Sequence, residues 1–77
     1  MNKTRRKQLE AVVEILTAQI AELESIKDDE QEAFDNLPEG FQCTERGETM
    51  GENIDELDTI IADLESVIES IDEIMEK

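Results

Sequence analysis

Apolar residues recur every seven positions in two long segments of the chain. Residues 54–74 contain three consecutive repeats, Ile-Asp-Glu-Leu-Asp-Thr-Ile, Ile-Ala-Asp-Leu-Glu-Ser-Val and Ile-Glu-Ser-Ile-Asp-Glu-Ile, whose first, fourth and seventh places are apolar. Leu9, Leu16 and Leu23 keep the same spacing in the first half of the chain. A seven-residue apolar repeat is typical of an α-helix that packs lengthwise against another helix. The pattern therefore predicts two long helices.

Interruptions of this pattern predict where the helices end. We expect one helix over about residues 3–34 and a second over about residues 49–75, with residues 35–48 as the junction. The junction holds the only proline and two of the three glycines, residue types that end helices. Thr49 followed by Glu52 matches a capping box, although Thr44 also offers a helix start. Two long helices joined in this way fold back as an antiparallel hairpin, so we predict a single all-α domain.

The apolar surface of each helix is wider than one hairpin needs. A two-helix seam uses two apolar places per seven residues, whereas both segments carry three. In a lone hairpin the third row would face water, and such a patch indicates an interface. We therefore expect a homodimer, an antiparallel four-helix bundle; the alternative is that a helix of another protein covers the row. The residues expected at this interface are Val13, Ile20, Ile54, Ile61, Leu64, Ile68, Ile71 and Met75.

The composition adds a large negative charge to this picture. The chain has 77 residues, with 22 acids against 7 bases and a net charge of −15, and only two aromatic residues. High charge with few aromatics is typical of disordered chains. The regular apolar spacing favours a folded protein, because disordered chains do not keep a helical period. We expect its stability to rise as salt screens the repulsion.

Candidate chemistry is sparse. Cys43 is the only cysteine and the chain has no histidine, so neither an internal disulfide nor a Cys–His pair can form. Glu65 and Glu69 share a helix face, but a solvated charged face explains such pairs better than acid–base or metal chemistry does. We therefore predict no enzyme, no cofactor and no metal site. The N-terminus lacks an apolar signal segment and no run is long enough to span a membrane, which together favour a cytoplasmic protein.

Two groups of residues near the ends of the hairpin suggest specific contacts. We expect the basic cluster at residues 5–7 to be neutralised by Asp72, Glu73 and Glu76 of the antiparallel neighbour; a phosphate site is the alternative. Arg46, the only base of the junction, is expected to pair with Asp28, Asp29 or Glu32, or else to contact a partner. The apolar junction residues are expected to close the loop end of the bundle, with a partner-binding role as the alternative; they are Phe34, Leu37 and Phe41.

Residues 28–48 read DDEQEAFDNLPEGFQCTERGE. This stretch resembles the core of a group of small acidic proteins of phages and prophages, which share a pattern close to EQEAFDNLPE followed by ERGE between two acidic helices. The close match covers about a quarter of the chain, and the remainder agrees in pattern only. The resemblance implies a helical hairpin and a phage-like setting, but no particular activity.

The charge density suggests a function. A dimer would carry −30 on a rod of roughly 45 Å, and duplex DNA of that length carries about 26 phosphates. We therefore predict a DNA mimic that binds a basic host enzyme of the restriction or CRISPR type and does not itself bind nucleic acid. One alternative is an assembly scaffold that acts through helix packing. Another is a sponge that binds a small anionic nucleotide through Arg5, Arg6 or Arg46. The acidic surface expected to contact the partner consists of Asp55, Asp58, Glu65, Glu69, Asp72 and Glu76.

Overall fold

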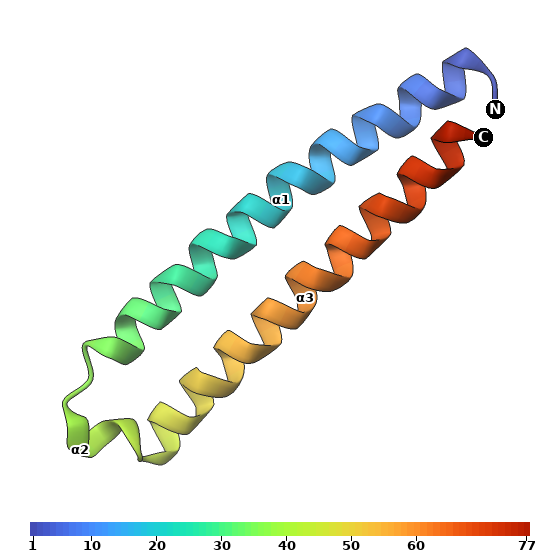
Figure 1. The fold of residues 1–77 in the computed structure, drawn as a ribbon. Coiled ribbons are helices and arrows are strands. Elements are labelled where there is room, and N and C mark those ends of the chain that lie inside the picture. Colours follow the sequence, from blue (N-terminus) through green and yellow to red (C-terminus); the bar gives the residue numbers. More distant parts are fainter.

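Two long antiparallel helices make up most of the molecule. The computed structural model covers residues 1–77 and contains α1 (Lys3–Asp35), the short α2 (Glu39–Gln42) and α3 (Glu45–Glu76). α1 and α3 pack against each other along the rod, and the two termini lie at the same end (Figure 1). The predicted all-α class and the predicted hairpin of two long helices are therefore confirmed. The four-helix bundle involves a second chain and stays a prediction.

α1 begins and ends within one residue of its predicted bounds. At its start the Asn2 side chain accepts a hydrogen bond of 2.8 Å from the backbone N–H of Arg5, which satisfies one of the free donors of the first turn. That turn contains no acid, although acids there would stabilise the helix dipole. At the other end the backbone N–H of Asn36 donates to the carbonyl of Glu32. The Asn2 cap therefore offsets a first turn whose charges are unfavourable.

α3 begins at Glu45, four residues before the predicted start at position 49. Thr44 is the residue before the helix, so the Thr49–Glu52 capping box is wrong and the alternative start is the one observed. The Thr44 hydroxyl does not cap the helix; it donates instead to the carbonyl of Phe41. Glu45 and Glu48 lie in the first turn, where their charges stabilise the helix dipole. This favourable charge lets the helix begin without a side-chain cap.

The seam between α1 and α3 is the core of the molecule. Its register is marked by a hydrogen bond of 3.1 Å from Asn53 to Glu30 and by an ion pair of 2.8 Å between Lys27 and Asp58. Only three apolar side chains are buried: Ile20, Met50 and Ile61, each 6–8% exposed. Most other seam residues remain half-buried, because two helices side by side cover only one face of each other.

The molecule is consequently an open rod. Its Cα atoms span 58 × 15 × 12 Å with a radius of gyration of 17.5 Å, against about 11.5 Å for a compact domain of this length. Its accessible surface is 5799 Å², whereas a compact protein of 8.8 kDa exposes about 4800 Å². The hairpin thus exposes about 1000 Å² more surface than a compact fold would.

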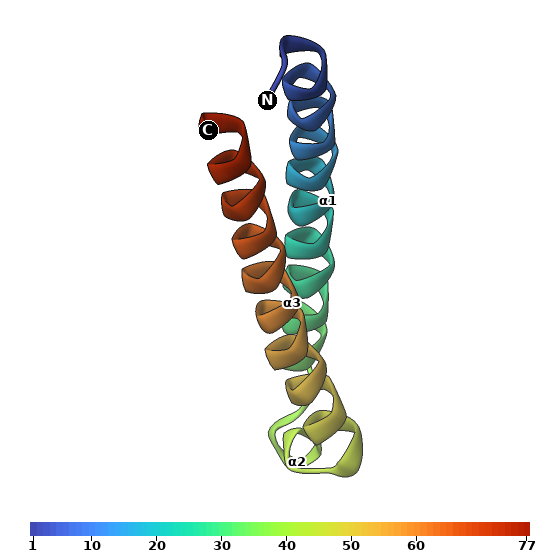
Figure 2. The same ribbon diagram turned by 90° about the vertical axis from the view of Figure 1, so that its right-hand side faces the viewer.

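α2 packs against the first turn of α3 and closes the loop end (Figure 2). The closest approach is at Gly47, which is buried and faces the backbone of Gln42. The Gln42 side-chain amide points to the carbonyls of Phe34 and Leu37, at 3.5 and 3.4 Å. Phe34 and Leu37 are half-buried and Phe41 is 59% exposed in the single chain, so the role of Phe41 in closing the loop end of the bundle stays a prediction.

Candidate interaction surfaces

The predicted interface residues lie in the seam of a single chain. Ile20 and Ile61 are buried there, and the remaining six are half-buried. Each alternates at steps of three and four residues with the other seam positions, as helix packing requires. Whether a second chain also contacts them stays a prediction. The six half-buried residues are Val13, Ile54, Leu64, Ile68, Ile71 and Met75.

A different set of apolar side chains is left open to solvent. We call it the outer row: one residue in every seven on each long helix, five of them apolar and 43–51% exposed. Ile15, beside this row on α1, is 63% exposed. An antiparallel helix pair has an approximate two-fold axis perpendicular to the plane of the helices, so equivalent rows lie on the same side of the hairpin. The outer row consists of Val12, Gln19 and Ile26 on α1 and Ile60, Val67 and Ile74 on α3.

The outer row and its extensions contain no acid. Continued to the helix ends at the same spacing, the two rows add Arg5, Ala33, Arg46 and Asn53, so none of the 22 acids of the chain falls in them. The opposite side of the seam is acidic. The predicted acidic surface lies there on α3, and all six of its side chains are exposed: Asp55, Asp58, Glu65, Glu69, Asp72 and Glu76.

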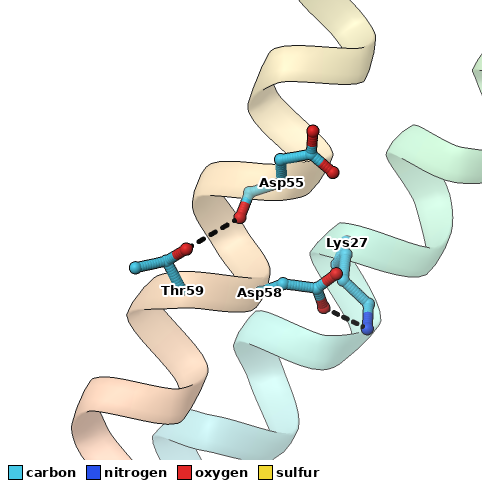
Figure 3. Close-up of polar contacts among 4 residues, drawn as sticks. All are labelled: Lys27, Asp55, Asp58 and Thr59. Atoms are coloured by element: carbon cyan, nitrogen blue, oxygen red, sulfur yellow. Dashed lines mark hydrogen bonds and ion pairs between the residues drawn. The ribbon is translucent and has the colours of Figure 1, made fainter.

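One ion pair connects the two long helices. Lys27 occupies a seam position and its ammonium group donates to a carboxylate oxygen of Asp58 at 2.8 Å (Figure 3). The hydrogen bond to Asp58 and the negative charge of that residue raise the pKa of Lys27 above its ordinary value. The hydroxyl of the next residue, Thr59, donates to the carbonyl of Asp55, one turn earlier in α3. Lys27 therefore interrupts the apolar seam but brings one acid of the acidic surface into a defined position.

The other predicted ion pairs are absent. Lys27–Asp58 is the only ion pair within 4.0 Å, so the predicted pairing of Arg46 with Asp28, Asp29 or Glu32 is wrong. Arg46 lies in the first turn of α3, whereas its expected partners are exposed on α1 between the seam positions 27, 30 and 34 and so do not face α3. Arg46 instead borders an open surface groove of about 650 Å³ with Phe41 and Glu45. The basic residues at positions 5–7 likewise make no ion pair with the end of α3.

The surface offers little to a small ligand. Its three hollows are open grooves, and no group of three or more Asp, Glu or Cys side chains is arranged to hold a metal ion. Cys43 is exposed and unpaired. Neither long helix has a stretch that is long and apolar enough to cross a lipid bilayer. The features that remain are the outer row and the acidic surface.

Sequence reasoning missed two of these features. It identified three apolar rows but did not assign Ile60, Val67 and Ile74 as the one that stays outside the seam. Spacing gave no signal for this choice, because the rows of Ile60 and of Ile61 both alternate with the row of Leu64 at steps of three and four residues. It also gave no role to Gln42, since a side-chain contact with the end of another helix leaves no periodic pattern.

Comparison of the chain with models of protein families, with curated proteins and with solved structures finds no match.

Proposed function

We propose that this protein is a binding protein whose acidic surface occupies the nucleic-acid groove of a basic host protein in the cytoplasm. The observation that carries the proposal is the free charge along the rod. Of its 22 acids, only Asp58 is engaged in an ion pair, and all six residues of the acidic surface are exposed. Unpaired carboxylates along a straight rod attract a positively charged groove and steer its approach.

Charge density favours two chains as the active form. A DNA duplex 58 Å long carries about 34 phosphates, whereas one hairpin of that length carries −15. Two hairpins side by side carry −30, close to the duplex value. The basic groove of the partner therefore meets, in a dimer, nearly the negative charge of the DNA that it normally binds. The resemblance of residues 28–48 to small acidic phage proteins suggests that the groove belongs to a host defence enzyme of the restriction or CRISPR type.

The test is capture of partners from a host lysate on the immobilised protein, at 50 and 500 mM salt and with duplex DNA as competitor. We expect a nucleic-acid-binding enzyme that is displaced by DNA and by salt, because both weaken contacts to a charged surface. The triple variant Asp55→Asn, Glu65→Gln, Asp72→Asn, which spares the paired Asp58, should reduce its capture about tenfold or more. A partner that resists salt and ignores DNA would overturn the proposal.

A matched variant controls for total charge. Glu22→Gln, Asp29→Asn, Glu32→Gln removes three exposed acids from α1, outside the acidic surface assigned to α3. We expect this variant to retain more binding than the α3 variant. Equal losses would mean that the partner senses net charge and not the acidic surface.

The exposed outer row favours a second candidate, a scaffold that packs against a helix of another protein. Such a contact is apolar, so it should persist at 500 mM salt. The variant Val67→Asp, which alters an exposed side chain, should abolish this contact. Ile61→Asp is a less direct test, because it would also disrupt the seam. Salt-resistant capture that Val67→Asp abolishes would support the scaffold over the mimic.

A further inference from the structure

We propose that the outer row is the surface through which two copies of this chain pair, and that the two hairpins lie antiparallel, with the loop end of each beside the termini of the other. The inference deepens the proposed function, because only two chains reach the charge density of DNA. It commits to a surface and an orientation that neither the seam nor the acidic surface defines.

The register of the hairpin places the outer-row residues at three common levels. The contacts Lys27–Asp58 and Glu30–Asn53 show which residues of α1 and α3 face each other. Continued along both helices, this register puts Ile26 within one to three residues of the level of Ile60, and likewise Gln19 with Val67 and Val12 with Ile74. Adjacent levels are seven residues, or about 10 Å, apart. Gln19 and Val67 thus form the central level of the row.

This arrangement is complementary to itself. A two-fold axis perpendicular to the rod at the central level places Val12 on Ile26 of the partner subunit and Ile60 on Ile74 of the partner subunit. Val67 then meets its own copy, and so does Gln19. All five apolar residues of the outer row contact an apolar residue, and the single polar residue is paired with the same amide, which can both donate and accept hydrogen bonds. Self-complementarity of this kind is what a two-fold dimer interface requires.

Apolar matching alone also permits a parallel pair, in which Val12 would meet Ile74 of the partner subunit. The distribution of charge decides between the two. Between the central level and the loop, residues 19–67 hold 16 acids and 2 bases, a net of −14. The terminal half, residues 1–18 and 68–77, holds 6 acids and 5 bases, a net of −1. A parallel pair sets −14 against −14, whereas an antiparallel pair sets each −14 against −1 and so reduces the repulsion severalfold.

The area of the face matches a stable interface. A side 58 Å long and 15 Å wide presents about 870 Å², and a standard protein interface covers about 800 Å² on each partner. The outer row itself holds no acid, which matters because a second copy also carries −15; flanking acids such as Glu56, which borders the same groove as Ile60, lie at the edge of the contact. The size of the side, the lack of acids within the outer row and its self-complementary spacing all fit a second copy of the chain.

The first measurement is the mass of the free protein by sedimentation equilibrium in 0.5 M salt. We expect 17.6 kDa, twice the 8.8 kDa of one chain, for the native sequence. Val67→Asp should give 8.8 kDa, because two carboxylates would meet at the axis. Ala62→Asp is the matched control: it adds the same charge to an exposed position of α3 outside the outer row, and it should stay dimeric. Circular dichroism of both variants verifies that the hairpin remains helical.

The second measurement gives the orientation. Cys43 is exposed near the loop and is the only cysteine, so a nitroxide label can be attached to the native sequence. In the antiparallel pair the labels lie at opposite ends, more than about 50 Å apart, whereas in a parallel pair they lie within about 30 Å. A monomeric native protein, a short label distance, or a dimer that survives Val67→Asp overturns the inference. These measurements use no partner, so their failure is distinguishable from a failure to capture a DNA-displaced enzyme.

Discussion

Gly47 shows how the absence of a single side chain positions the loop end. It lies in the first turn of α3 and is buried against the backbone of Gln42. A Cβ atom at this position would lie 2.7 Å from the carbonyl carbon and 2.9 Å from the Cα atom of Gln42. Real side chains do not approach backbone atoms so closely, so only glycine allows α2 to pack here. The contact in turn places Gln42 near the carbonyls of Phe34 and Leu37.

Replacement of Gly47 by alanine should therefore lower the free energy of unfolding by about 1–3 kcal/mol, because α2 must move away from α3. Gly51→Ala is the matched control on the same helix, where a Cβ atom meets nothing within 4 Å. That change should instead stabilise the protein by about 0.5–1 kcal/mol, since alanine favours the helix. Urea denaturation followed by circular dichroism measures both. Stabilisation by both substitutions would contradict the packing of α2 on Gly47.

At the scale of the helices, the three apolar rows of α3 have two different surroundings, the seam and the solvent. Two rows of α3 lie in the seam, represented by Ile61 at 6% exposure, and the third lies outside it, represented by Ile60 at 44%. These neighbours have the same side chain and the same helix propensity. Their different surroundings follow from the 100° turn between successive residues of an α-helix.

Ile61→Ala should accordingly lower the free energy of unfolding by about 2–4 kcal/mol, because it removes buried contacts of the seam. Ile60→Ala should cost less than about 1 kcal/mol in the monomer, where this side chain is largely solvated. The measurement is thermal unfolding at a protein concentration low enough to keep the chain monomeric. At high concentration the Ile60 variant should lose dimer stability as well. Equal effects in the dilute monomer would mean that the seam is assigned to the wrong rows.

At the scale of the whole molecule, repulsion between acids opposes a fold with a thin core. Three buried apolar side chains stabilise a chain whose net charge is −15. One ion pair at the side of the seam offsets little of this repulsion, since exposed pairs contribute little. The open rod therefore depends on screening by salt, or on a partner, more than a compact domain does.

The Tm of the native protein should rise between 20 and 500 mM NaCl as the ions screen the acids. The variant Glu65→Gln, Glu69→Gln removes two like charges one helical turn apart. It should unfold at a higher temperature than the native protein at low salt and respond less to added salt. Circular dichroism at 222 nm follows both transitions. A helical signal that falls as salt is added would contradict a charge-limited fold.

The sequence by itself determined the two long helices, because an apolar residue every seven positions and a break at residues 35–48 depend only on local periodicity. It also determined the excess of acids and the existence of a third apolar row. The tertiary structure decided what contacts what: that α3 begins at Glu45, that Arg46 makes no ion pair, that Gly47 meets Gln42, and that Lys27 is held by Asp58. The contacts of Gly47 with Gln42 and of Lys27 with Asp58 join residues of different helices. Their distances are set by how the helices pack, which no local pattern records.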